Sequence, residues 1–316
     1  MSATALVTLV AMVVSAEGPI LRVDKGLIDG LREGDRGVVY YTLTVASAEK
    51  VIEVDSGQVT AVDDFSATVR VVAEATVRPG YRLRFELEAE RTSPAALMMG
   101  ARDALDAGRL DAARRYLGTI RLAPDDPLLP EILAQLEKIR ALAGMVRISG
   151  GTYEVGVDLP EAKYYNQHPR FPLPLRSLWI DRRAVTRAEF REFRAEFSFP
   201  PDGPEEFATG VSFAEAESYC RWRGKRLPNE FEWEVAAGGA LMVTAASLYE
   251  WTASWYKPYP GNPFPETEYG GGYRVLRAAA AEDGFDHRRR RFLAPEARQP
   301  HVGFRCARDA AKGSGR

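Results

Sequence analysis

The spacing of apolar residues changes twice along this 316-residue chain, and the change limits the fold more than any single motif does. Residues 1–90 are short runs rich in Val, Ile, Thr and Tyr between Gly/Asp turns, which predicts a small all-β domain resembling a barrel. In residues 94–143 apolar side chains recur at i, i+3 and i+4, which predicts helices. Residues 145–308 mix short strands, a few capped helices and many aromatic side chains, which by themselves predict only a mixed, loop-rich domain. Residues 309–316 are expected to form a flexible tail.

The helical segment is predicted to be a hairpin followed by a third helix. Its positions Ala101, Gly108, Ala113 and Pro124 resemble a single tetratricopeptide repeat. A lone repeat cannot bury its own apolar face, so it must pack on a neighbouring domain or a partner. A helical linker between two domains is the favoured interpretation, and a peptide-binding groove is the alternative.

The N-terminal residues allow two interpretations. Residues 1–16 are apolar and end in small residues like a secretory signal, but no Lys or Arg precedes Arg22. Their β-branched run leads into a turn at Glu17-Gly18, which favours a first β-strand. The run is too short to span a bilayer, so no transmembrane segment is expected. A cytoplasmic location is favoured, and export through an atypical signal is the alternative.

Bulk composition describes an ordinary globular protein. Apolar residues make up 46% of the chain and the net charge is −2, so no nucleic-acid partner is expected from charge. The run Arg288–Arg291 matches a basic-patch pattern but stands alone. Neither the oligomeric state nor the cellular compartment follows from two cysteines.

Three helix starts in the last region carry a capping box. In each, a side-chain oxygen can accept a backbone N–H while a Glu three residues later reaches back to the cap. These signals fix helix starts and carry no chemistry. The pairs are Thr186/Glu189, Ser212/Glu215 and Asn229/Glu232.

Six segments of the last region follow one another in an order that resembles a known family. They are MVRISGGTYEVG (145–156), residues 166–193 with their His-Pro pair and Val-Thr cap, residues 210–239, LYEWTASWYKPYPGN (248–262), YRVLR (273–277) and VGFRCARDA (302–310). Together they resemble the formylglycine-generating enzyme, or sulfatase-modifying factor, family. The resemblance implies a C-type-lectin-like α+β fold with many loop contacts.

In that family, two cysteines after the Val-Leu-Arg strand bind copper and oxidise a substrate cysteine. Soft thiolates suit Cu(I), so the reaction needs both sulfurs. Here Ala278–Ala280 replace the small Gly-Gly-Ser stretch, and the thiol positions fall near Asp283 and Arg288. No cysteine lies between Cys220 and Cys306. The resemblance therefore implies that copper is not bound and that oxidation is lost.

The two remaining cysteines match family positions with a structural role. Cys220 and Cys306 resemble the pair that joins the long helix to the last strand, so they are expected to be adjacent. We expect a disulfide in an exported protein and free thiols in a cytosolic one. Glu250 matches the one surviving carboxylate of the family's calcium loop; with so few oxygens left, calcium is an alternative and no cofactor is the expectation.

The segment around the arginine run is the candidate binding cleft. Trp251 and Trp255 are expected in the core, and alternate arginines of the run are expected to point inward and outward. The pair Asp283 and His287 lacks a third ligand, so no metal site is expected there. The candidate cleft residues are Tyr256, Tyr259, Asp283, His287, Arg288 and Arg290.

These observations predict a non-catalytic pseudoenzyme that serves as a binding or scaffolding module in a bacterial signalling or defence system. Its partner is expected to be a protein or an acidic peptide, which would suit the arginines. One alternative is an enzyme that uses Asp283, Asp286 and His287 as acid–base groups. A second alternative is formylglycine generation. The iron-dependent sulfoxide synthases of the superfamily use three histidines, a pattern that the widely spaced His168, His287 and His301 do not reproduce.

Overall fold

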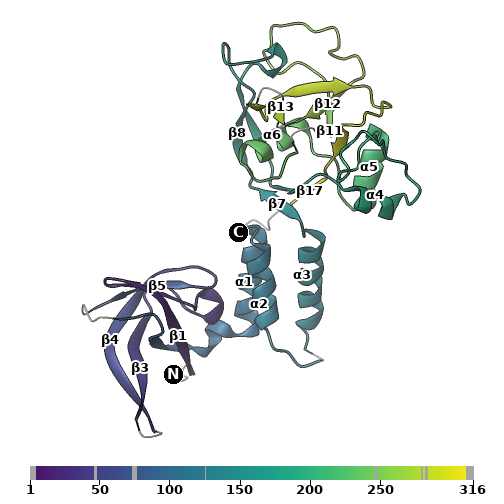
Figure 1. Ribbon diagram of the computed structural model, residues 1–316. Coiled ribbons are helices and arrows are strands. Elements are labelled where there is room, and N and C mark those ends of the chain that lie inside the picture. The colour runs from purple at the N-terminus through teal and green to yellow at the C-terminus, as the bar shows by residue number, and fades with distance from the viewer. Residues whose placement is uncertain are drawn as a thin grey trace. The chain divides into compact units, whose positions relative to one another are not determined.

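The computed structural model describes residues 5–45, 48–72, 77–124, 126–245, 248–278, 280–281 and 284–310. The chain forms two compact units, Met1–Ala141 and Leu142–Arg316, each of which has its own core (Figure 1). Among the described helices, none combines the length and the apolar character that crossing a bilayer requires.

The first unit begins with a closed six-stranded antiparallel barrel in the order β1-β2-β5-β4-β3-β6. Its strands are β1 (Leu6–Glu17), β2 (Ile20–Val23), β3 (Arg36–Val45), β4 (Ala48–Val62), β5 (Ala67–Val71) and β6 (Arg82–Glu88), with a 3-10 turn at Leu27–Asp29. The predicted N-terminal strand is confirmed by β1. Alternate side chains such as Leu21, Val69 and Phe85 fill the interior. Gly37 faces Phe85, and a Cβ there would lie 2.6 Å from the ring, so only glycine fits.

Three helices complete the first unit. They are α1 (Pro94–Asp106), α2 (Leu110–Thr119) and α3 (Leu129–Ala141), after a 3-10 turn at Ala89–Thr92. Ile28 and Phe65 of the barrel loops pack against the helical core, and Tyr116 donates a hydrogen bond to Asp64 at 3.3 Å. Arg109 pairs with the same carboxylate. The helices therefore belong to the same compact unit as the barrel.

The second unit is a mixed α+β domain built from small sheets. One has the order β17-β10-β7 and another the order β15-β12-β11-β16, in which β11 and β16 are parallel. Two hairpin-like pairs, β8-β9 and β13-β14, accompany them. The strands are β7 (Met145–Ile148), β8 (Gly151–Val155), β9 (Phe171–Leu175), β10 (Leu178–Asp181), β11 (Tyr249–Trp255), β12 (Arg274–Arg277), β13 (Ala280–Ala281), β14 (Gly284–Phe285), β15 (Arg290–Leu293), β16 (Val302–Phe304) and β17 (Ala307–Asp309).

The helices of the second unit begin where the capping boxes predict. They are α4 (Arg187–Phe193), α5 (Phe213–Trp222) and α6 (Glu230–Gly238), with a 3-10 turn at Tyr165–Gln167. In each box the cap side chain accepts from the glutamate's N–H and the glutamate accepts from the cap's N–H. The three predicted helix starts are therefore confirmed.

Candidate functional site

A network of buried ion pairs, called the ion-pair lattice below, holds the arginine-rich segment to helix α6. Arg277 and Arg290 face each other across β12 and β15. Arg277 donates to Glu230 at 3.0 Å and to Glu234 at 2.8 Å. Arg290 donates to Glu230 at 2.7 and 3.1 Å. Because Glu230 and Glu234 lie one turn apart on α6, the helix presents two carboxylates to one cross-strand arginine pair. All four side chains are buried.

Two tyrosines complete this lattice. The Tyr259 hydroxyl accepts from Arg277 at 2.7 Å, and its ring lies 4.2 Å below the guanidinium of Arg290. Burial raises the pKa of Tyr259 well above its usual range. Tyr256 accepts from Asn166 at 2.8 Å and is equally buried. Both rings serve the interior, so the expectation that Tyr256, Tyr259 and Arg290 line an open cleft is wrong.

The prediction that alternate arginines of the run point inward and outward is wrong. Arg290 is buried, Arg291 is exposed, and Arg288 and Arg289 are half-buried. The reason is that β15 begins at Arg290, so strand alternation applies only from that residue onward. Arg288 precedes the strand in a turn and pairs with Asp286 at 3.3 Å.

The two tryptophans of β11 differ. Trp251 is fully buried and donates to the carbonyl of Val211 at 2.9 Å, as a core residue should. Trp255 is 46% exposed, so its predicted place in the core is wrong. It lies at the end of β11, where the guanidinium of Arg274 stacks 3.5 Å from its ring centroid. A cation–π contact at the surface replaces burial.

Glu250 is an ion-pair residue in the core. Its two oxygens accept from Arg305 at 2.6 Å each, and one also accepts from Trp233 at 3.0 Å. The side chain is 1% exposed. A calcium ion at Glu250 would have to displace the guanidinium of Arg305. Among the described residues, no group of three or more His, Cys, Asp or Glu side chains is placed to hold a metal.

The remaining residues of the predicted cleft have different surroundings from one another. Asp283 and Ala279 lie outside the described residues. Burial alone would raise the pKa of Asp286, but hydrogen bonds from Gln167 and Arg288 outweigh it and hold that pKa below its usual range. His287 borders an open hollow of about 510 Å³.

His287 is fitted against the end of α6. A Cβ at Gly238 would lie 2.8 Å from its Nε2, so the imidazole occupies space that only glycine leaves. Burial lowers the pKa of His287, which keeps the ring neutral at physiological pH. Tyr153, Glu154 and Leu241 line the same hollow.

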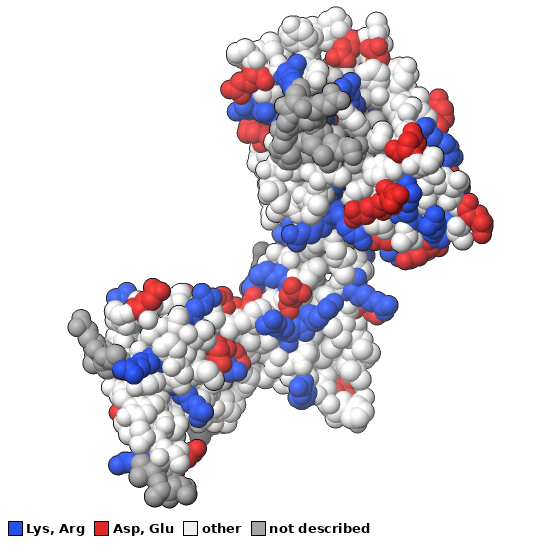
Figure 2. Space-filling view, in the orientation of Figure 1, with Lys and Arg blue, Asp and Glu red and all other residues white. Residues whose placement is uncertain are grey.

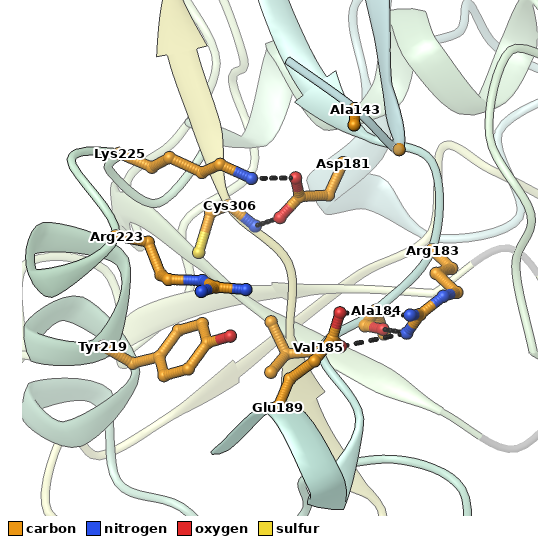
Figure 3. A pocket seen from close by; sticks show the side chains of 11 residues that line it. Ala143, Asp181, Arg183, Ala184, Val185, Glu189, Tyr219, Arg223, Lys225 and Cys306 are labelled. Atoms are coloured by element: carbon orange, nitrogen blue, oxygen red, sulfur yellow. Dashed lines mark hydrogen bonds and ion pairs between the residues drawn. The ribbon is translucent and has the colours of Figure 1, made fainter. Parts of the chain in front are cut away.

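A second, smaller hollow of about 100 Å³ lies beside the disulfide between Cys220 and Cys306 (Figure 3). The bond joins α5 to the chain just after β16, so the adjacency implied by the family resemblance is present. Three cationic and two acidic side chains line the hollow, together with Tyr219. They are Arg183, Arg223, Lys225, Asp181 and Glu189.

Sequence reasoning missed this second hollow. Its lining comes from the chain just before β7, from the end of β10 and the chain after it, from α4, from α5 and its C-terminal turn, and from the chain after β16. No short motif spans these segments, and the matched cysteines were the only signal that two of them meet. On the face drawn in Figure 2, basic and acidic side chains are interspersed over the second unit.

The second unit thus defines a loop-rich α+β domain whose interior is organised by Arg–Glu pairs and one disulfide. Residues 132–247 match the family model described as "Sulfatase-modifying factor enzyme 1-like domain". The chain therefore contains a domain of the formylglycine-generating enzyme, or sulfatase-modifying factor, family. The matched range ends before β11, so the segment between β12 and β15 lies beyond it.

Relatives of this domain include both an inactive protein and an enzyme. Inactive C-alpha-formylglycine-generating enzyme 2 of Bos taurus is 26% identical over 274 residues, covering 54% of this chain and 90% of the relative. Hercynine oxygenase of Mycolicibacterium thermoresistibile is 27% identical over 297 residues, covering 63% of this chain and 67% of the relative. The solved structure of PvdO from Pseudomonas aeruginosa is 19% identical with a TM-score of 0.41, covering 52% and 94% of the two chains. Family membership alone does not choose between the two roles.

Proposed function

We propose that this protein is a non-catalytic member of its family that acts as a binding or scaffolding module, with a lectin-like C-terminal domain. The observation that carries the proposal is that both cysteines of the chain are joined in a disulfide. The chain has two cysteines, and both are joined in the disulfide between α5 and the C-terminal strands. A copper-thiolate oxidation needs two free thiolates at one place, and this chain has none to supply.

The arrangement of the arginine segment supports the same proposal. Arg277 and Arg290 use the strands that flank the segment to neutralise Glu230 and Glu234 in the interior. Side chains that satisfy buried charges are committed to stability and cannot also bind a substrate without leaving those charges unpaired. The relative named as inactive fits this interpretation.

We further propose that the module serves a bacterial multi-protein signalling or defence system and that its partner is a protein or an acidic peptide rather than a nucleic acid. Glu250 supports stability in this proposal and does not bind calcium, because Arg305 and Trp233 already use its oxygens.

An altered enzyme is the second candidate function, and one observation favours it. His287 borders an open hollow and has a lowered pKa, which suits a proton acceptor. The hercynine oxygenase relative is an enzyme by name. Against this stands Asp286, whose two oxygens already accept from Gln167 and Arg288.

The experiment is a direct assay for oxidation. The purified protein is supplied with copper and incubated with a cysteine-containing sulfatase peptide, and aldehyde is measured by mass spectrometry next to an active formylglycine-generating enzyme. We expect no aldehyde and no copper retained after desalting, because no thiolate pair is free to hold Cu(I). Stoichiometric copper together with aldehyde would contradict the proposal.

A further inference from the structure

The small hollow beside the disulfide holds hydrogen-bond donors that the protein itself does not use. Tyr219 is 3% exposed, yet its hydroxyl makes no hydrogen bond to the residues that the structure describes. Lys225 has three N–H donors and directs one to Asp181 at 2.7 Å. Arg223 has five N–H donors and makes one contact of 3.4 Å to Glu192. Figure 3 shows the Tyr219 hydroxyl and the Arg223 guanidinium facing the same space.

The acceptors of the hollow are already engaged. Asp181 accepts from Lys225 with one oxygen and from the backbone N–H of Cys306 at 3.0 Å with the other. Both oxygens of Glu189 accept from Arg183 at 3.0 Å, and one also accepts from the Thr186 cap. The donors that remain face the open space of the hollow and keep unused hydrogen-bonding capacity, so a group that enters the hollow must bring acceptors with it.

Charge and size narrow the class of that group. Three cationic and two acidic side chains line the hollow, which leaves one excess positive charge, enough for a monoanion. Its volume of about 100 Å³ admits a group of a few heavy atoms. Ligand pockets that enclose a whole small molecule are several times larger, roughly 300–1,000 Å³. The hollow therefore fits the end of a ligand.

We propose that this hollow binds a carboxylate presented by the protein's partner, with Tyr219, Arg223 and Lys225 as the donors. A carboxylate is a monoanion with two acceptor oxygens, and its hydrogen bonds to cationic donors are the strong kind. Two sources carry this group, the C-terminus of a chain and an acidic side chain. The proposal rests on the proposed role as a binding module and adds the chemistry that the partner must have.

Burial keeps the Tyr219 hydroxyl a donor. It raises the pKa of Tyr219 to about 12, so the phenol stays protonated at neutral pH. The ring also stacks on Phe190 and meets Phe304 edge-on, which fixes where the hydroxyl points. A Tyr219→Phe substitution should therefore preserve the packing and remove only the donor.

The test uses the full-length protein and defined probes. Acetate and its neutral analogue acetamide are titrated while the backbone amide of Gly144, which borders the hollow, is followed by NMR. Three glycine-rich peptides then identify the source by fluorescence anisotropy: one with a free C-terminus, one amidated, and one amidated that carries a single glutamate. We expect acetate and at least one carboxylate peptide to bind, and acetamide and the plain amidated peptide not to bind. Phosphate is expected to bind more weakly, because its extra charge is not matched.

Two variants and one control connect the binding to the hollow. Tyr219→Phe and Arg223→Gln should each weaken the carboxylate affinity about tenfold, as expected for a lost hydrogen bond to a charged group. Arg221→Gln, on the same helix but outside the hollow, should leave it unchanged. The Arg223 side chain is 39% exposed, so we expect its variant to fold even where a change in the core does not. Equal binding of acetate and acetamide, or variants that bind as well as wild type, would overturn the proposal. The aldehyde assay does not depend on carboxylate binding, so the proposed non-catalytic role and the proposed carboxylate site can each fail without the other.

Discussion

Arg290 and Arg291 are neighbours in sequence with opposite surroundings. Arg290 is buried, donates to both oxygens of Glu230 and also to the backbone carbonyls of Asn166 and Lys257. Arg291 points outward from the same strand and is exposed. A buried pair is costly to break from one side only, since the remaining charge stays in the interior without its partner.

We therefore predict that Arg290→Met lowers the free energy of unfolding by about 3 kcal/mol or more. The matched control Arg291→Met should change it by no more than about 0.5 kcal/mol, because surface substitutions rarely do more. Urea denaturation of both variants, followed by circular dichroism, measures the difference. Equal effects at the two positions would show that the lattice around Glu230 does not stabilise the fold.

At single positions, sequence reasoning succeeds where a residue has one plausible environment and fails where it has two. Trp251 is buried and the cysteine pair is joined, as expected. Tyr256 and Tyr259 could have faced solvent or the interior, and what decides is the buried charge on Arg277 and Arg290, which no local pattern encodes. Trp255 is exposed because it is the last residue of β11, where the guanidinium of Arg274 covers its ring in place of the core.

Among the elements, helix α6 depends on its first turn. Asn229 accepts from the backbone N–H groups of Phe231 and Glu232, each at 2.9 Å. These contacts fix the residue at which the helix begins. They thereby set the register in which Glu230 and Glu234 reach the arginines of β12 and β15.

Asn229→Ala should lower the free energy of unfolding by about 1 kcal/mol, the usual cost of losing a helix cap. The reason is that two N–H groups at the start of α6 lose their acceptor. Chemical denaturation monitored by circular dichroism gives the value. Glu217→Ala, which removes an exposed carboxylate from α5, serves as the control and should have little effect. A loss at Asn229 no larger than at Glu217 would argue against the cap as the determinant.

Helix starts are predictable here because every interacting group lies within four residues. The hollow beside the disulfide is not, since its lining meets only after β10, α4, α5 and the C-terminal strands have packed. The barrel strands are also evident from their composition, whereas the closure of the sheet depends on the pairing of β1 with β6, from Leu6 with Glu88 to Met12 with Arg82. Local signals thus determine elements, and long-range pairing determines sites.

For the whole molecule, the disulfide is the longest covalent constraint. Cys220 and Cys306 are 86 residues apart, and bridging a loop of that length restricts the unfolded chain strongly. Replacing both with alanine should lower the free energy of unfolding of the second unit by roughly 4–5 kcal/mol. Guanidinium denaturation followed by the tryptophan fluorescence of that unit measures the change.

The first unit provides an internal control for this prediction, because both cysteines of the chain belong to the second. The unfolding transition of the barrel should therefore shift little between the wild type and the double alanine variant. Reduction of the wild-type disulfide should reproduce the effect of the double substitution. A change below about 1 kcal/mol would mean that the unfolded state is already constrained in some other way.

The closure of the barrel restricts how anything can attach to the first unit. Each of the six described strands has a neighbour on both sides along part of its length. Tyr41–Thr44 of β3 and Glu49–Asp55 of β4 pair only with each other, so this end of the hairpin keeps free edges. The outer face of β1 instead carries the exposed apolar side chains Val10, Met12 and Val14. Association at the closed part of the barrel must therefore work by side-chain complementarity across its outer wall, and backbone pairing with a foreign strand is restricted to the edges that the closure leaves open.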